Sequence, residues 1–233
     1  MAGGNFTFRN FTIHQERCAM KVGTDGVLLG AWANGGRRIL DIGTGTGLIA
    51  LMMAQRFDEA DITAVEADHD AAAQARTNAD SSPYGQRICV AATEIQRFES
   101  PTPFDAIVAN PPYFNASLKN PDTQRAAARH TDSLTYGELF AAVKRLLADE
   151  GEFSAVIPTD CLQAFIAEAY LAGMTQTRRL AIRTTPRKQP KRCLVAFARK
   201  SNGELESGEQ CLQTTDGGRS AWYEELTKDF YIK

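Results

Sequence analysis

Residues 38–54 (RILDIGTGTGLIALMMA) constrain the fold more than any other part of the chain. An apolar run typical of a buried strand leads into alternating glycines, and an apolar, helix-forming stretch follows. A strand, a glycine-rich turn and a helix in this order form the nucleotide-binding opening of a doubly wound α/β fold. Because glycine has no side chain, Gly43 and Gly45 allow backbone to approach a ligand closely.

The spacing of these glycines discriminates between cofactors. A dinucleotide fingerprint that starts at Gly43 requires a glycine at position 48, where the chain has Leu48. Asp41 precedes the first glycine, and its carboxylate would repel a pyrophosphate but attract an ammonium or sulfonium group. The loop therefore favours a cofactor that carries a positive charge.

Two more acids follow the next predicted strands. Residues 61–65 form a strand that ends at Glu66, 23 residues after Gly43, where a carboxylate can accept both ribose hydroxyls. Residues 88–90 form another strand, and Glu94 just beyond it is a candidate acceptor for the amino group of an adenine. A plain surface position is the alternative for both residues.

A fourth predicted strand, residues 106–109, ends abruptly in Asn110-Pro111-Pro112-Tyr113. Proline lacks the N–H that a sheet requires and keeps the preceding residue extended, so the chain leaves the strand in a rigid turn. The turn offers the Asn110 amide oxygen, the Pro111 carbonyl and the Tyr113 ring. Two acceptors and a stacking ring suit a planar amine, which is the substrate group that this turn predicts.

Strands alternate with helices over most of the chain, which predicts an α/β, doubly wound, mostly parallel sheet with helices on both faces. Asp41, Glu66, Glu94 and Asn110 follow successive strands, at the edge where such a sheet binds its ligands. We expect three parts of one domain: an N-terminal cap (1–35), the core (36–200) and a tail (201–233) with a short docked helix.

A helix is also predicted over the apolar residues 27–32, which follow Lys21-Val22-Gly23-Thr24-Asp25-Gly26. Thr24 or Asp25 is placed to cap this helix, and its free N–H groups would then face an anion. A plain capped helix without a ligand is the alternative.

The segment 175–203 holds nine basic residues and no acid. Two predicted strands in it flank a basic loop, for which a contact surface for phosphates and a solvated hairpin tip remain equally open. The candidate RNA contacts in this loop are Arg187, Lys188, Lys191 and Arg192. The net charge of −2 does not exclude a nucleic-acid partner, because the compensating acids lie elsewhere.

Five scattered cysteines without a C-x-x-C pair predict neither a zinc site nor a disulfide framework. Free thiols favour the reducing cytoplasm. We expect no signal peptide and no membrane span, because no basic-apolar leader opens the chain and no apolar run approaches about 20 residues.

The glycine motif and the Asn-Pro-Pro-Tyr turn resemble those of the class I, S-adenosylmethionine-dependent amino-methyltransferases. Residues 20–32, 110–114, 190–192 and 226–231 are similar to the bacterial family that methylates N6 of adenine 37 in the anticodon loop of a valine tRNA. The resemblance implies a Rossmann-like sheet of seven strands, the last antiparallel. It also implies S-adenosylmethionine as cofactor, tRNA as partner, no metal, no membrane, and a monomeric cytoplasmic enzyme.

The resemblance assigns roles to individual residues. Asn110, Pro111 and Tyr113 would hold the target base, and Asn110 would also lie against the cofactor. Glu66 would bind the ribose, and Glu94 the adenine amino group, although many relatives have Asp there. The residues assigned to the methionine part of the cofactor are Lys21, Gly23, Thr24, Asp41, Gly43 and Gly45.

Other functions stay open from the residues alone. The same two acceptors could hold a carboxamide, as in a protein glutamine N5-methyltransferase, or a base of ribosomal RNA, as in adenine-N6 and guanine-N2 methyltransferases. A nicotinamide-dependent oxidoreductase is disfavoured by Leu48 in place of the third glycine. A non-catalytic RNA-binding module would leave the predicted cofactor loop unexplained.

Overall fold

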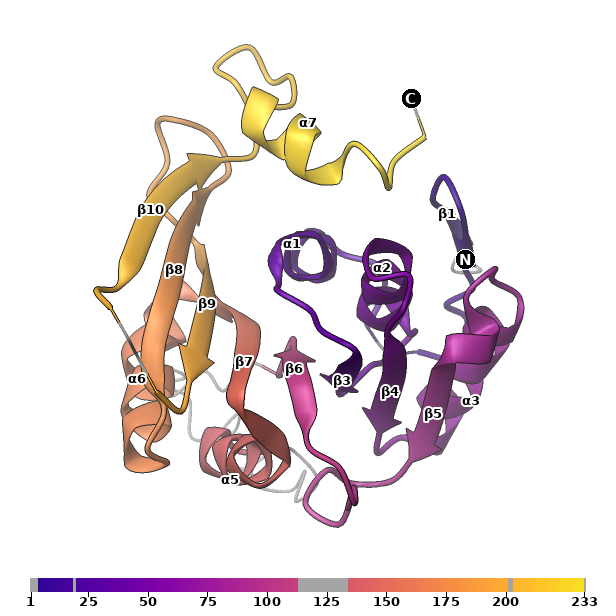
Figure 1. The fold of residues 1–233 in the computed structure, drawn as a ribbon. Helices are drawn as coiled ribbons and strands as arrows, with labels where there is room; N and C mark the ends of the chain where they lie inside the picture. Colours follow the sequence, from indigo (N-terminus) through magenta and orange to yellow (C-terminus); the bar gives the residue numbers. More distant parts are fainter. Residues whose placement is uncertain (1–3, 19, 113–133, 201–202, 233) are drawn as a thin grey trace, which may run out of the picture.

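A computed structural model describes residues 4–18, 20–112, 134–200 and 203–232. The strands of its main sheet are β3 (Arg38–Ile42), β4 (Asp61–Glu66), β5 (Ile88–Ala92), β6 (Phe104–Ala109), β7 (Leu147–Pro158), β8 (Thr175–Arg183), β9 (Arg192–Ala198) and β10 (Glu206–Cys211). Their order across the sheet is β10-β8-β9-β7-β6-β3-β4-β5 (Figure 1). Only β9 runs antiparallel to its neighbours, β7 and β8.

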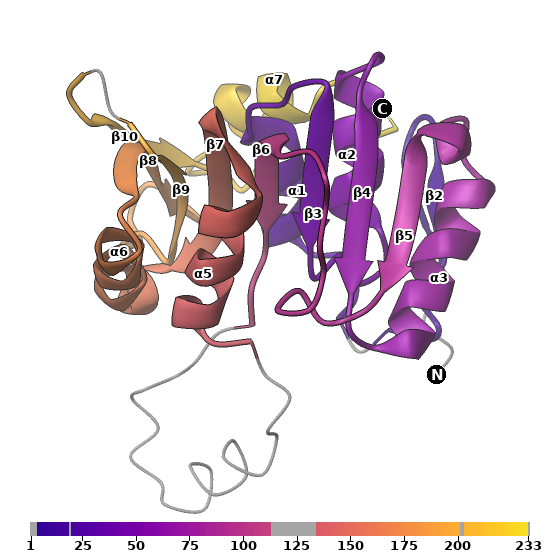
Figure 2. The ribbon, with the colours of Figure 1, turned by 60° about the horizontal axis from the view of Figure 1, so that its bottom comes forward.

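Helices cover both faces of this sheet. They are α1 (Thr24–Trp32), α2 (Leu48–Arg56), α3 (His69–Asp80), α5 (Tyr136–Leu146), α6 (Leu162–Leu171) and α7 (Ala221–Thr227), with short 3-10 turns η1 (Gly85–Arg87) and η2 (Thr159–Cys161). The two views show α5 and α6 on one face, and α1, α2 and α7 on the other (Figures 1 and 2). Helix α3 packs beside α2, because a Cβ on Gly47, at the N-cap of α2, would lie 3.4 Å from the Cβ of Ala75 in α3. The doubly wound α/β prediction is confirmed.

The seven strands β3 to β9 form the predicted sheet, and β9, the last of them, is antiparallel as expected. The tail adds an eighth strand, β10, which pairs in parallel with β8 at the edge of the sheet. Its sequence, ESGEQC, is mostly polar and exposed, so backbone pairing rather than core burial holds it there. An ion pair between Arg183 and Glu209 at 2.5 Å joins the two strands.

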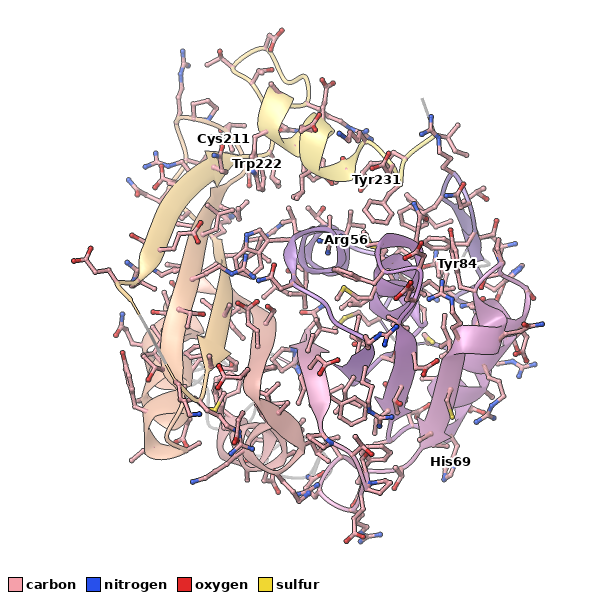
Figure 3. The ribbon with its side chains drawn as sticks, in the orientation of Figure 1. Arg56, His69, Tyr84, Cys211, Trp222 and Tyr231 are labelled. Atoms are coloured by element: carbon pink, nitrogen blue, oxygen red, sulfur yellow. The ribbon has the colours of Figure 1, made fainter. Side chains whose placement is uncertain are left out.

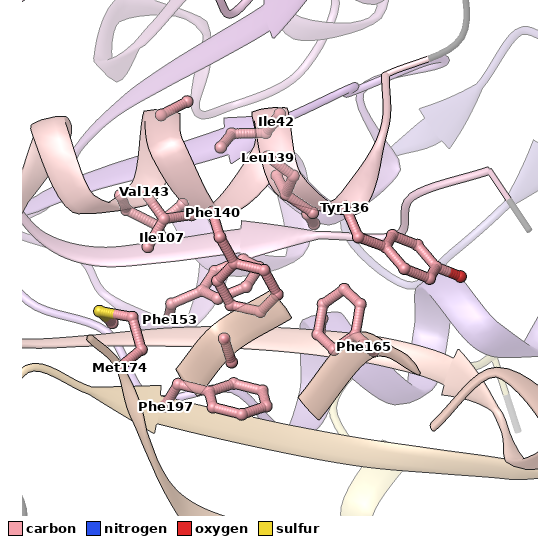
Figure 4. Packing of buried hydrophobic residues seen from close by; sticks show 14 of the residues in the cluster. Ile42, Ile107, Tyr136, Leu139, Phe140, Val143, Phe153, Phe165, Met174 and Phe197 are labelled. Carbon is pink, nitrogen blue, oxygen red and sulfur yellow. The ribbon is translucent and has the colours of Figure 1, made fainter. Parts of the chain in front are cut away.

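Helix α5 carries the clearest amphipathic pattern in the described chain. Thr135 caps its start and forms a reciprocal capping box with Glu138. The inner face packs Phe140 against Phe165 and Phe153, with ring centroids 4.8 Å and 5.5 Å apart (Figure 4). This aromatic cluster fixes α5 and α6 on the face of the sheet opposite α1.

The two ends of the chain meet beside α1 and α2. A small hairpin of β1 (Phe6–Thr7) and β2 (Thr12–Ile13) precedes α1. The Phe8 ring stacks on Tyr231 at 5.8 Å, and the Arg9 N–H donates to the Phe230 carbonyl at 2.7 Å.

Nearby, Arg56 fastens α2 to the end of α1 (Figure 3). Its guanidinium donates to the carbonyls of Gly30 and Ala33 at 2.9 Å and 2.7 Å, which satisfies carbonyl groups that the end of a helix leaves free. Burial lowers the pKa of Arg56 from its ordinary value. The contact holds the carboxyl end of α1 against α2.

Candidate active site

The turn after β3 adopts a backbone that requires glycine. Gly43 and Gly45 have φ angles of 69° and 55°, in the left-handed region that residues with a Cβ rarely adopt. The space where their Cβ atoms would lie is open, so the demand comes from the backbone conformation and not from a clash. The turn therefore presents bare backbone to the space above the sheet.

Asp41 lies beneath this turn. Its side chain is 0% exposed, and its Oδ2 accepts hydrogen bonds from the Thr44 hydroxyl at 2.6 Å and the Ala50 N–H at 3.1 Å. Burial raises its pKa to about 7, although these two hydrogen bonds oppose the shift. The carboxyl is thus enclosed and holds the turn to α2, and the direct cofactor contact expected for Asp41 stays a prediction.

Glu66 ties the same turn to β4. Its Oε2 accepts the Gly45 N–H at 2.9 Å and its Oε1 accepts the Asp68 N–H at 3.0 Å. The backbone N–H groups of Gly43 and Thr44 donate to the Val65 carbonyl at 2.8 Å and 3.1 Å. Half-buried at the carboxyl end of its strand, Glu66 lies beside the turn at the ligand-binding edge, where the sequence predicted it.

Asn78 also holds the turn, from helix α3, and sequence reasoning did not identify it. The residue is fully buried, and its Nδ2 donates to the Thr46 and His14 carbonyls, both at 2.8 Å. Its Oδ1 accepts the His14 N–H at 3.0 Å. An asparagine in a helix gives no sequence signal for such a role, because its partners lie far away in the chain.

A cavity of about 300 Å³ opens above the turn. Its walls come from four separate segments: the residues just before and at the start of α1, the turn after β3 with the start of α2, Asn110 after β6, and Arg192 at the start of β9. Because β3 and β6 are parallel neighbours, their carboxyl ends meet at one edge of the sheet, as predicted. The expected residues that line the cavity are Lys21, Gly23, Thr24, Gly43, Gly45 and Asn110.

The start of α1 differs from the prediction in its cap. Gly23, not Thr24 or Asp25, occupies the N-cap position, and no side chain caps the helix. Helix N-terminal N–H groups without side-chain acceptors attract anions. The Lys21 ammonium, at the rim of the same cavity, donates to the Gln15 carbonyl.

Asn110 directly follows β6. Its side-chain amide points toward the segment before α1, and its Nδ2 lies 3.8 Å from the Met20 sulfur. Pro111 is buried behind it, as a rigid turn requires. Tyr113, the third residue predicted to hold the target base, lies outside the described residues. Met20 lines the cavity beside Asn110 and was not predicted as a separate site residue.

Glu94 lies apart from the cavity. Its side chain is exposed after β5 and forms an ion pair with Arg97 at 3.2 Å. Exposed pairs of this kind contribute little to stability. The predicted contact with an adenine amino group has no counterpart among the cavity walls that the structure describes.

Arg192 lies apart from the other three candidate RNA contacts. The sequence grouped it with the exposed basic loop, but it is the first residue of β9, lines the cavity and pairs with Asp25 at 2.9 Å. The other three candidate RNA contacts, Arg187, Lys188 and Lys191, are exposed between β8 and β9. None of these three forms an ion pair within the described ranges.

Two further observations concern metal ions and membranes. The described parts of the chain bring together no group of three or more His, Cys, Asp or Glu side chains that could hold a metal ion. Within those same parts, no helix is both long and apolar enough to cross a membrane.

Comparison with solved structures shows the fold. A predicted O-methyltransferase from Agrobacterium tumefaciens superposes with a TM-score of 0.68 at 18% identity, covering 88% of this chain and 96% of that one. The glycopeptide N-methyltransferase MtfA, complexed with S-adenosyl-L-methionine, has a TM-score of 0.57 at 13% identity, covering 78% of this chain and 90% of that one.

Comparison of sequences finds relatives of much higher identity than the solved structures. The methyltransferase small domain family matches residues 22–177. A tRNA1(Val) (adenine(37)-N6)-methyltransferase of Bacteroides thetaiotaomicron is 47% identical, covering 100% of this chain and 99% of that protein. Proteins of the same name from Phocaeicola vulgatus and Aeromonas hydrophila are 48% and 46% identical, with at least 97% of each chain covered. The chain therefore belongs to the methyltransferase small domain family and, within it, to the tRNA1(Val) (adenine(37)-N6)-methyltransferases.

Proposed function

We propose that this chain transfers a methyl group from S-adenosylmethionine to the exocyclic N6 of adenine 37 in a valine tRNA. One observation carries the proposal: Asn110, the candidate acceptor for an amine, lines the same cavity as the glycine turn. A cofactor held by the turn and an amine held by Asn110 would therefore share one space. The names of the related proteins supply the identity of the amine.

The residues around the turn fit S-adenosylmethionine. Left-handed glycines give a bare backbone cradle, and Glu66 lies beside it as a candidate acceptor for the ribose hydroxyls. Lys21, Gly23 and Thr24 would face the methionine part, where the uncapped start of α1 offers N–H groups to a carboxylate. When bound, the cofactor supplies a methyl group on a sulfonium, which is already electrophilic.

The protein's main task is then to place and polarise the amine. The lone pair of N6 is delocalised into the adenine ring, which makes this nitrogen a weak nucleophile. Asn110 Oδ1 and the Pro111 carbonyl would accept its two N–H bonds and aim the lone pair. Acceptor dipoles that face the developing positive charge also stabilise the transition state, and no general base is needed before the methyl moves. Tyr113 would stack on the base.

RNA would reach the site from the loop between β8 and β9. Strand β8 is antiparallel to β9, which is antiparallel to β7, so β8 ends at the same edge of the sheet as β6. Arg187, Lys188 and Lys191 follow that end and are exposed, as phosphate contacts must be. An adenine in an anticodon loop can swing into the cavity for roughly a few kcal/mol. We propose that the enzyme acts as a monomer in the cytoplasm.

Methylation of total tRNA tests the function. The protein is incubated with S-adenosylmethionine and, in separate reactions, with tRNA fractionated by species, ribosomal RNA and protein extract from cells that lack the modification, and each digest is analysed by mass spectrometry. We expect new N6-methyladenosine, confined to valine tRNA. Methyl transfer to ribosomal RNA or to protein glutamine instead would replace this substrate with one of the alternatives, and no transfer to any of them would overturn the proposal.

A further inference from the structure

Asp25 and Arg192 place opposite charges side by side in the wall of the cavity. Arg192 Nη1 lies 2.9 Å from Asp25 Oδ1, and each side chain keeps about a quarter of its surface exposed, 25% for Asp25 and 24% for Arg192. Both residues line the cavity together with the glycine turn and Asn110. The pair therefore contacts whatever the cavity binds.

The fold brings this pair together from distant segments. Arg192 begins β9 opposite Pro158, the last residue of β7, and so stands at the carboxyl edge of the parallel strands. Asp25 lies in the first turn of α1 and lines the cavity at the same edge. The remaining basic side chains of the segment that form ion pairs do so with Glu152, Glu209, Asp149 and Glu150, none of which lines the cavity.

A carboxylate beside a guanidinium matches a ligand group that also carries both charges. A guanidinium has five N–H donors, so the contact with Asp25 leaves donors of Arg192 for a ligand. The uncapped N-terminus of α1 adds N–H groups that favour an anion at the same place. In S-adenosylmethionine, only the amino-acid end carries a carboxylate and an ammonium on one carbon.

We propose that Arg192 binds the α-carboxylate and Asp25 the α-ammonium of the methyl donor's amino-acid end. This inference rests on the proposed function, because it takes S-adenosylmethionine as the ligand. It moves Arg192 from the RNA surface to the cofactor site and adds Asp25 to it. Charge-assisted hydrogen bonds of this kind are about twice as strong as neutral ones, so their loss is measurable.

Two ligands distinguish binding of the amino-acid end by Arg192 and Asp25 from a general effect of the substitutions on the cavity. S-adenosylhomocysteine keeps the amino-acid end, whereas 5′-methylthioadenosine shares the adenosine and sulfur but lacks that end. Isothermal titration calorimetry measures both with the wild type, Arg192→Gln and Asp25→Asn. We expect each variant to bind S-adenosylhomocysteine about tenfold more weakly or worse, with the affinity for 5′-methylthioadenosine within about twofold of wild type. Arg192→Lys, which keeps the charge, should recover part of the loss.

Arg183→Gln is the matched control, because Arg183 belongs to the same basic segment and also pairs with a carboxylate, but lies outside the cavity walls. It should bind both ligands as the wild type does. An equal loss for both ligands, or no loss in Arg192→Gln while tRNA binding weakens, would overturn the inference and leave the methyltransferase proposal standing. A wild-type protein that binds neither ligand would overturn both.

Discussion

The Glu66 carboxylate accepts the backbone N–H of Gly45 at 2.9 Å, and this contact joins the end of β4 to the glycine turn after β3. The other oxygen of Glu66 accepts the Asp68 N–H, so each oxygen already fixes backbone before any ligand binds. The turn is thus preorganised by a residue that sequence analysis assigned only to the cofactor.

Glu66→Gln should weaken cofactor binding about tenfold, because glutamine has one acceptor oxygen and cannot hold both N–H groups. Calorimetry with S-adenosylhomocysteine measures the change. Glu59→Gln is the control, since Glu59 is an exposed side chain paired only with Arg37 at the opposite edge. An affinity within twofold of wild type in Glu66→Gln would show that the carboxylate matters neither for the turn nor for the ribose.

Asp41 should make stability depend on pH. Burial raises its pKa to about 7 from the ordinary 3.8, so between these values the native protein binds a proton that the unfolded chain has released. The stability that this group contributes is therefore full below about pH 4 and declines as the pH rises toward 7, by at most about 1.4 kcal/mol per pH unit.

Urea unfolding of the wild type and Asp41→Asn at pH 4 to 8 tests this. Asparagine cannot ionise, so the free energy of unfolding of the wild type should fall relative to that of the variant across this range. A difference that stays constant with pH would mean that Asp41 titrates at its ordinary pKa.

Asn78→Ala should lower the free energy of unfolding by about 2 kcal/mol, because it leaves buried backbone groups of Thr46 and His14 without partners. The loosened turn should also bind S-adenosylhomocysteine more weakly. Asn34→Ala, which removes an exposed amide, is the comparison variant. Equal stability of the two variants would contradict the role of Asn78 in holding the turn.

Replacing Arg187, Lys188 and Lys191 together by glutamine should weaken tRNA binding and reduce the slope of log affinity against log salt by roughly two units. Filter binding at several salt concentrations gives the slope. Arg37→Gln, at the start of β3 and hence at the opposite edge of the sheet, should leave it unchanged. An unaltered slope in the triple variant would place the RNA surface elsewhere.

The sequence predicts the sheet and the glycine turn well because both depend on local patterns. Apolar runs, glycine spacing and the Pro111-Pro112 stop are visible within a few residues, and parallel strand ends then bring Asn110 to the turn. Strand β10 could not be predicted in this way, since an exposed polar edge strand has no alternation of apolar and polar residues.

Other surroundings of the predicted site residues depend on tertiary contacts, which local patterns do not show. Asp41 precedes a glycine in sequence, but only the packing of α2 shows that its carboxyl is enclosed. Arg192 follows basic residues, yet the register of β9 against β7 turns it into the cavity. Glu94 follows its strand as an adenine ligand would, and the structure shows it paired with Arg97 in solvent, so its contact with an adenine stays a prediction.

The most direct test of the whole account is methyl transfer to a valine tRNA transcript by the wild type and Asn110→Ala, with calorimetry on both. The wild type should form one N6-methyladenosine, at position 37, and a transcript with guanine there should accept none. Asn110→Ala should lose at least about a hundredfold in rate while binding S-adenosylhomocysteine within a few-fold, because Asn110 acts on the amine. Methylation by Asn110→Ala at the wild-type rate would contradict the assignment of this residue and, with it, the mechanism.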